Sequence, residues 1–368
     1  MSENINFRLA QPEDDEPLRA LLRGSRMPGA ISLAPTCEPS FFRAIEVEGF
    51  DRQTIVAVKA DRILGVGVAG KRLVCMNGRA REVGYLSRLR LAPEIRNTPA
   101  LARGYQFLRR CHDEFMKVPF YFTSIMEDNS EAVGLLTSRR AGLPIYRPLA
   151  RYCTTLIPAR CEKRSRPFAK VQVVSGKEFS SSAIMQFVNN VGRNKEFYPV
   201  YSESDLDKSN GLLRGLRLDD FLVAKEDGRI VGTLALWDQS AFRQIIVARY
   251  SPWMKFVRGA LKPLCRLLGV AALPATGVPV RISTAACVAI EGNRSDIFGQ
   301  LLVQALHQLK KKNKDFLLVG VAQSDPLQQV AESFLHLTVN SQIYTVAWDE
   351  EVVCDLDGRI PYFELGSL

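Results

Sequence analysis

The sequence is poor in the residues that build metal centres and catalytic triads. It contains only three histidines, His112, His307 and His336, and none has a second ligand residue at metal-binding spacing. Its eight cysteines include no pair at the C-x-x-C spacing that is typical of zinc sites and redox couples. These absences argue against a histidine-based triad and against a metal mechanism. They predict that the cysteines are reduced and mostly buried.

Long apolar runs are also missing. The longest, Leu267 to Val280, is interrupted by Pro274 and Gly277 and is shorter than the roughly 20 residues that cross a bilayer. The opening residues, Met1 to Asn4, lead into an acidic cluster at Glu13 to Glu16, which is unlike a signal peptide. We therefore expect a cytoplasmic protein without a membrane span.

The composition that is present is globular, with an uneven distribution of charge. A chain of 368 residues, 46% of them hydrophobic, is long enough for two domains with their own cores. The net charge is +10, and residues 1–160 carry 24 Lys and Arg against 17 Asp and Glu. No basic block is interleaved with aromatic residues, so the charge of the first half favours a polyanionic cofactor over nucleic acid.

Hydrophobic periodicity predicts a strand, a helix, a hairpin, a strand, a helix, a strand, a helix and a strand in the first half. We expect them at residues 7–10, 14–23, 54–69, 82–91, 99–115, 119–125, 129–139 and 151–157. Thr98 followed by Pro99 is typical of a helix start, with Thr98 as the N-cap. The charged, proline-containing stretch at residues 159–169 indicates a linker.

The same order of elements recurs after the linker, which indicates two copies of one unit. The early hairpin in each copy favours mixed α/β sheets in tandem over a doubly wound parallel sheet. We expect one domain at residues 1–158 and a second at residues 170–368. A basic amphipathic insertion at about residues 251–279 is compatible with a membrane surface, but we expect it to cover the second domain or a partner subunit.

The segment Leu89 to Tyr105, LRLAPEIRNTPALARGY, resembles the signature of the GNAT acyltransferase superfamily. In that signature a strand ends at a hydrophobic-x-Pro step, and an arginine-led loop then enters a helix. The segment Asn129 to Tyr146 is similar to the family's next block, an Asn-x-x-Ala helix followed by a glycine turn. The resemblance covers most of residues 5–157, although both glycine places of the family's loop are changed after Arg96.

The resemblance implies that the first half binds acetyl-CoA or another acyl-CoA as co-substrate. The implied contacts come from the strand edge, the loop, the first helical turn and the next helix. They are Leu89, Leu91, Arg96, Asn97, Thr98, Ala100, Leu101, Arg103 and Asn129. A helix N-terminus with nearby arginines suits the phosphates of CoA.

The reaction that the resemblance implies is direct attack of an amine acceptor on the acyl thioester. It indicates Glu82 as the general base and Tyr146 as a substitute for the family's acid. The alternative interpretations are a solvated carboxylate at the strand end for Glu82 and a half-buried tyrosine at the domain edge for Tyr146. The terminal segment Phe363 to Leu368 is also able to reach a cleft between the two domains.

The matching segment of the second half, Ala289 to Gly299, keeps an arginine at Arg294 but has Asp296 in the first turn of its helix. A carboxylate there repels phosphate, so we expect a degenerate copy. An N-acetyltransferase is the preferred function. The alternative is a catalytically eroded acyl-CoA sensor or scaffold, and a homodimer is compatible with either.

Overall fold

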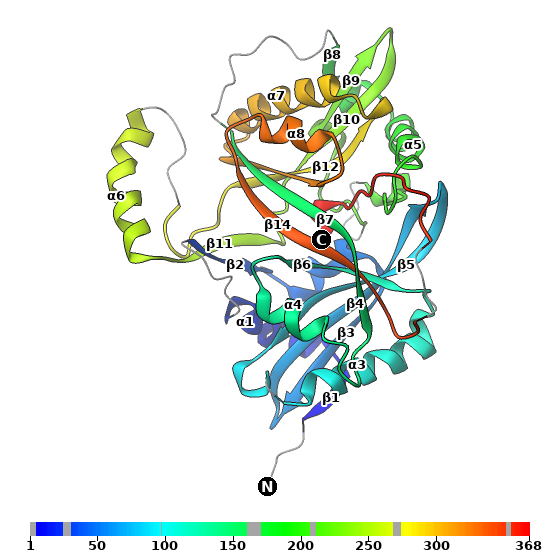
Figure 1. Ribbon diagram of the computed structural model, residues 1–368. Helices are drawn as coiled ribbons and strands as arrows, with labels where there is room; N and C mark the ends of the chain where they lie inside the picture. The colour runs from blue at the N-terminus through cyan, green and yellow to red at the C-terminus, as the bar shows by residue number, and fades with distance from the viewer. Residues whose placement is uncertain are drawn as a thin grey trace.

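The computed structural model describes residues 5–24, 31–96, 98–159, 171–206, 211–267, 274–350 and 355–368. A mixed sheet of twelve strands runs through the whole molecule, and a separate sheet of two strands lies at its side (Figure 1). Helices pack along the large sheet, while the C-terminal segment lies near the middle of the molecule (Figure 1). The fold is therefore mixed α/β, as the sequence predicts.

The first half follows the predicted order of elements, with a short strand and a short helix added after the first helix. Its strands and helices are β1 (Asn6–Leu9), α1 (Asp15–Gly24), β2 (Ile31–Thr36), α2 (Phe41–Ile45), β3 (Phe50–Lys59), β4 (Arg62–Met76), β5 (Arg79–Leu91), α3 (Ala100–Cys111), β6 (Tyr121–Met126), α4 (Ser130–Leu136) and β7 (Ile145–Pro158). A π-helical turn, His112–Met116, extends α3 to the predicted length.

The second half repeats the unit, as the sequence predicts. Its strands and helices are β8 (Gln172–Ser175), α5 (Ser181–Gly192), β9 (Phe221–Glu226), β10 (Arg229–Trp237), β11 (Gln244–Tyr250), α6 (Pro252–Leu267), β12 (Ile282–Ile290), α7 (Ser295–Lys311), β13 (Phe316–Ala322), α8 (Leu327–Glu332) and β14 (Leu337–Ala347). Corresponding hairpins join β3 to β4 and β9 to β10. Their two-residue turns, Ala60-Asp61 and Asp227-Gly228, all have positive φ, which suits the right-handed twist of the strands.

The two halves exchange their last strands within the large sheet. The strand order is β1-β3-β4-β5-β6-β14-β7-β13-β12-β10-β9-β8. Thus β14 of the second half pairs with β6 of the first, while β7 of the first half pairs with β13 of the second. Each half needs the other to complete its sheet. Most of the predicted linker lies outside the described residues, and the division into two domains stays a prediction.

The inserted segment of the second half contains helix α6, which follows strand β11 of the small sheet. Strand β11 pairs with β2 of the first half, so the small sheet ties the two halves together. Helix α6 stands away from the body at the left of Figure 1 and makes its main contacts with β11. The strand that α6 contacts belongs to the second half, and the prediction that the insertion covers the second domain or a partner subunit stays a prediction.

Three further sequence predictions concern the cysteines, membrane-spanning helices and metal ligands. The five cysteines whose surroundings are described, at positions 37, 75, 111, 153 and 287, are buried free thiols, which confirms the prediction for them. Within the described ranges no helix combines the length and the apolar character that crossing a membrane requires. The same part of the chain holds no cluster of three metal-ligating side chains.

Candidate functional site

Strands β5 and β6 run side by side for a very short distance and then separate. Their parallel pairing consists of Gly84 with Tyr121 and Tyr85 with Phe122. A Cβ atom at Gly84 would lie 2.1 Å from Cδ1 of Tyr121, so only glycine fits at this contact. Beyond it, β5 continues to Leu91 and pairs, among the described strands, with β4 alone, which leaves one edge of β5 open.

A β-bulge decides which backbone groups face that open edge. Arg88 has a φ of 58°, and the register with β4 shifts between Val66 and Val68. After the bulge, the N–H of Ala92 donates to the carbonyl of Leu64 at 2.7 Å. Because the backbone groups of successive residues alternate in direction along a strand, the N–H and C=O groups of Leu89 and Leu91 point to the open edge. These are the two strand residues that the resemblance assigns to acyl-CoA.

Two arginines concentrate positive charge at the open edge. Arg90 Nη1 donates to the Leu89 carbonyl at 2.7 Å, and Arg96 Nε donates to the Leu91 carbonyl at 3.1 Å. Burial lowers the pKa of Arg90, and the nearby charges of Arg88 and Arg96 lower it further. No ion pair within the described part of the chain neutralises Arg90 or Arg96. An anion bound at this edge would relieve that repulsion.

Arg90 is absent from the sequence prediction. The alternation of Arg88 and Arg90 at the end of a predicted strand is the signal that points to it, together with Arg96 in the loop that follows. Periodicity alone does not separate such a pair from two solvated arginines on an exposed strand.

The loop after β5 leads directly to the N-terminus of α3. Pro99 is the N-cap, one residue later than predicted, and Thr98 Oγ1 accepts the N–H of Ala100 at 3.2 Å. The side chains of Ala100 and Leu101 are buried, so only backbone groups are available to a ligand here, and the N–H of Ala100 is already donated to Thr98. The first N–H groups of a helix have no acceptor within the helix, which leaves this end suited to an anion. The predicted residue Asn97 lies outside the described residues.

Two other predicted contact residues have structural partners. The Arg103 guanidinium donates from Nη2 to the Ile5 carbonyl at 2.8 Å and lies over the Phe7 ring, so it holds β1 against α3. Asn129 is the N-cap of α4, and its Oδ1 accepts the N–H of Ala132 at 3.2 Å. The Asn-x-x-Ala pattern thus has a capping role in this chain.

The predicted base and acid do not meet at the open edge. Glu82 is exposed on β5, before the parallel pair, and Leu89 is seven positions further along the strand, which amounts to about 23 Å. Tyr146 is buried, and its hydroxyl shares a hydrogen bond with the Tyr105 hydroxyl of α3. Burial raises the pKa of Tyr146 well above its ordinary value.

A buried charge network lies on the other side of the bulge, and the sequence prediction missed it. Glu48 is 1% exposed and accepts hydrogen bonds from Arg88 Nε at 2.7 Å, from Ser87 Oγ at 2.5 Å and from Arg243. Burial by itself raises the pKa of Glu48, but Arg88 and Arg243 outweigh burial and the net shift is downward. The network fixes the bulge and joins the two halves. Glu48 is far from β5 in the sequence and lies in no motif, so nothing local points to it.

No protein-family model matches the sequence, and no curated protein matches it either. Solved structures do share its architecture. The N-acetyltransferase region of a fungal multi-domain GH3 beta-N-acetylglucosaminidase aligns with a TM-score of 0.60 and 11% identity over 94% of this chain and 38% of that chain. A GCN5-related N-acetyltransferase from Sphaerobacter thermophilus aligns with a TM-score of 0.56 and 12% identity over 99% and 98%.

Saccharomyces cerevisiae N-myristoyltransferase, solved with bound myristoyl-CoA, aligns with a TM-score of 0.57 and 11% identity over 94% of this chain and 80% of that chain. The fold is that of the GCN5-related N-acetyltransferases. This chain spans little more than a third of the fungal protein, but it matches the Sphaerobacter acetyltransferase over almost its whole length. The GNAT resemblance seen in the sequence is thus confirmed at the level of the fold.

The second GNAT unit has the same bulge, but its edge is occupied by the chain itself. Cys287 of β12 has a φ of 49°, as Arg88 of β5 has a φ of 58°. The N–H of Cys287 donates to Glu364 Oε2 at 2.9 Å, and the N–H of Val288 donates to the Tyr362 hydroxyl at 3.3 Å. The edge that is open in the first half is therefore filled by the C-terminal segment in the second.

The loop at the end of β12 is likewise committed to internal partners. Arg294 pairs with Asp296 in the first turn of α7 at 2.9 Å and with Glu226 at 2.9 Å. Asn293, just before Arg294, belongs to a buried cluster in which Lys195 Nζ donates to Asp325 at 2.5 Å and to Asn293 at 2.9 Å. The basic side chains Arg294 and Lys195 are thus paired with carboxylates within the protein.

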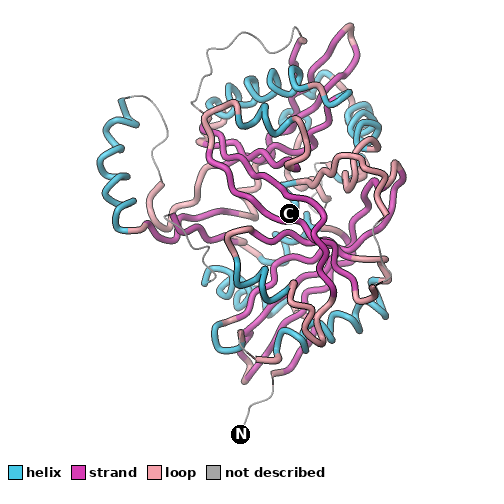
Figure 2. The backbone as a smooth tube through the Cα atoms, in the orientation of Figure 1, coloured by secondary structure: helices cyan, strands magenta, loops and turns pink. Residues whose placement is uncertain are grey.

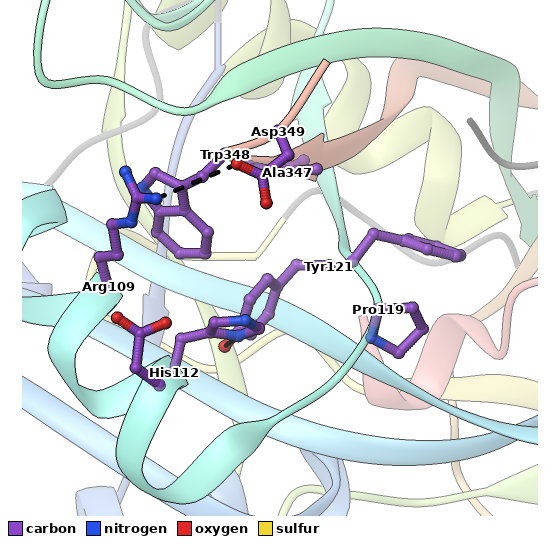
Figure 3. Close-up of a pocket in the computed structure, with 10 residues that line it drawn as sticks. Arg109, His112, Pro119, Tyr121, Ala347, Trp348 and Asp349 are labelled. Carbon is purple, nitrogen blue, oxygen red and sulfur yellow. Dashed lines mark hydrogen bonds and ion pairs between the residues drawn. The ribbon is translucent and has the colours of Figure 1, made fainter. Parts of the chain in front are cut away.

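A shallow hollow where the end of α3 and the start of β6 meet the end of β14 is distinct from the open edge. Its lining residues are Arg109, His112, Asp113, Pro119, Phe120, Tyr121, Val346, Ala347, Trp348 and Asp349 (Figure 3). His112 Nδ1 and the Tyr121 hydroxyl lie 3.1 Å apart, and Arg109 reaches toward Asp349 (Figure 3). His112 is twelve residues beyond Ala100, which puts the hollow about 18 Å along α3 from the helix N-terminus.

Proposed function

We propose that the chain is an acyl-CoA-dependent N-acyltransferase, which moves an acetyl group from acetyl-CoA to an amine acceptor. In this proposal the first GNAT unit binds acyl-CoA along the open edge of β5, and the second unit completes the fold. The observation that carries the proposal is the difference between the two equivalent edges. The edge at Leu89 is open and bordered by Arg90 and Arg96, whereas the edge at Val288 is filled by Glu364 and Tyr362.

Each part of the proposed site matches a part of acyl-CoA. The N–H groups of Leu89 and Leu91 offer strand-like hydrogen bonds to the amide-rich arm. The N-terminus of α3, with Arg90 and Arg96 beside it, suits the diphosphate. Positive charge in this half of the sequence supports the same assignment.

The proposed chemistry is a direct transfer. The amine nitrogen attacks the carbonyl carbon of the thioester, a β5 N–H polarises the carbonyl oxygen, and the carbon–sulfur bond breaks. The amine loses one proton, and the CoA thiolate that leaves takes one up. Glu48 is a poor acceptor for that proton because Arg88 and Arg243 hold its pKa down.

Tyr146 and Glu82 stay in the proposal in the roles that the resemblance gives them. The raised pKa of Tyr146 keeps its hydroxyl protonated, which is the state needed to donate to a thiolate. The Tyr146 hydroxyl is hydrogen-bonded to the Tyr105 hydroxyl. The role of acid therefore requires that hydrogen bond to break, so that Tyr146 becomes accessible from the open edge of β5. Glu82, being exposed, is able to accept a proton only through solvent.

The first test is ligand binding combined with turnover. We expect acetyl-CoA to raise the melting temperature while NAD and ATP do not, because neither a dinucleotide nor a Walker glycine pattern is present. Thiol release from acetyl-CoA in the presence of a panel of amines then measures transfer. No thermal shift with any acyl-CoA at millimolar concentration would contradict the proposal.

The same experiment separates the enzyme from its alternative, an eroded acyl-CoA sensor or scaffold. The distance of Glu82 from Leu89 and the committed hydroxyl of Tyr146 favour that alternative. A sensor gives the thermal shift with acetyl-CoA but releases no thiol with any amine. An enzyme gives both.

A further inference from the structure

Helix α6 presents large apolar side chains to solvent. It extends from the body of the molecule beyond β11 (Figures 1 and 2). Trp253 is 58% exposed and Phe256 is 79% exposed, whereas Arg258 lies with its guanidinium 5.6 Å from the centre of the Tyr250 ring of β11. The helix is therefore attached to the protein partly through its basic side, and its aromatic residues point elsewhere.

The sequence of α6 separates two kinds of residue onto two faces of the helix. At 100° per residue, one face is apolar throughout. Its positions are Trp253, Phe256, Val257, Ala260, Leu261, Leu264 and Leu267. The opposite face contains the only charged positions of the helix, and all of them are basic: Lys255, Arg258, Lys262 and Arg266.

We propose that α6 binds the surface of an anionic lipid membrane, lying in the plane of the interface with Trp253 and Phe256 inserted. The helix has basic residues and no acidic one, so its net positive charge attracts acidic headgroups while the apolar face inserts. The net charge of +10 on the chain adds a long-range attraction to an anionic membrane. This inference is independent of the proposed acyl transfer.

The size of the face argues against a second copy of the chain as its occupant. A helix of 16 residues is about 24 Å long, and one face of it covers a few hundred Å². A stable interface buries about 800 Å² on each partner. A membrane sets no such minimum, because binding there is the sum of inserted apolar side chains and headgroup attraction.

The test is co-sedimentation of the full chain with vesicles at physiological salt. Vesicles of phosphatidylcholine alone are compared with vesicles of phosphatidylcholine and phosphatidylglycerol. We expect the protein to sediment with the anionic vesicles only, and the emission of Trp253 to shift to the blue as it enters the interface. The double variant Trp253→Ala, Phe256→Ala should reduce the bound fraction at least tenfold, and raised salt should weaken binding of the wild type.

The matched control is Leu335→Ala with Leu337→Ala, two apolar residues that are each 64% exposed but lie outside α6. This control should bind as the wild type does, and thermal melts of both double variants verify that they fold. Failure of the wild type to sediment with anionic vesicles overturns the proposal, as does equal loss in the control. A dimer that becomes monomeric in the Trp253→Ala, Phe256→Ala variant, without vesicle binding, also overturns it and assigns the face to a second copy.

Discussion

Two buried carboxylates, one beside each bulge, have opposite pKa shifts. Glu48 lies beside the bulge residue Arg88, and Glu364 lies beside the bulge residue Cys287. Arg88 and Arg243 lower the pKa of Glu48 against the effect of burial. Burial raises the pKa of Glu364, because backbone and hydroxyl donors are its only hydrogen-bond partners in the described structure. One bulge is thus fixed by ion pairs and the other by an almost neutral network.

The Glu48 network gives a prediction about stability. Glu48→Gln leaves Arg88 and Arg243 buried without a carboxylate, so we expect the free energy of unfolding at pH 7 to fall by about 3 kcal/mol. The contribution of Glu48 is fully present above the pKa of an unfolded glutamate, about 4.3, and is lost as pH falls through the lower folded pKa. Urea denaturation across pH measures both effects, and the two proteins should converge in acid.

Glu46→Gln is the matched control for this prediction. Glu46 also pairs with an arginine of the second half, Arg214, but its side chain is 23% exposed. Its loss should change the free energy of unfolding by about 1 kcal/mol or less. Equal destabilisation by the two variants would show that the buried network has no special weight.

At the scale of single elements, the sequence predicted the order of both units because amphipathic periods are local signals. It placed β5 too late, since the Asn77-Gly78 turn, which joins β4 to β5 with positive φ at both residues, was not used. It missed β2 and β11 because each pairs with a strand of the other half, and short strands of this kind show no clear period alone. The exchange of β7 and β14 is a pairing choice between distant segments, which periodicity does not encode.

Of the candidate site, the sequence predicts a strand edge and a helix end, which stay a proposal, and the structure adds the charges around them. Leu89, Leu91 and Arg96 come together at the open edge of β5. The contact of Arg103 with the Ile5 carbonyl was not foreseen because Ile5 is remote in sequence. Arg90 and Glu48 were missed because their meaning depends on burial and on partners from other elements.

The close contact between β5 and β6 can be tested at Gly84. Gly84→Ala forces a methyl group into the Tyr121 ring, so we expect the free energy of unfolding to fall by about 1–3 kcal/mol. Thermal or urea denaturation measures it. Gly134→Ala on α4, where nothing lies within 4 Å, is the control and should be neutral or stabilising by up to about 1 kcal/mol. A Gly84→Ala protein as stable as this control would contradict the packing described here.

At the scale of the whole molecule, the exchanged strands make the two GNAT units interdependent. β14 lies between β6 and β7, so removing either half leaves unpaired strands in the other. We therefore expect one cooperative unfolding transition for the full chain, seen identically by calorimetry and circular dichroism. Two separate transitions, or a stable isolated first half, would show that the units fold independently.

The central claim is that acyl-CoA binds the first GNAT unit and not the second. Isothermal titration of acetyl-CoA into Arg96→Ala and Arg294→Ala tests it most directly, because the two arginines follow corresponding strands. Loss of a charge-assisted contact at Arg96 should weaken binding roughly tenfold or more, and Thr98→Asp should act in the same direction. Arg294→Ala should leave the dissociation constant unchanged, since Arg294 is already paired with Asp296 and Glu226. Abolished binding in Arg294→Ala with normal binding in Arg96→Ala would contradict the account and assign acyl-CoA to the second unit.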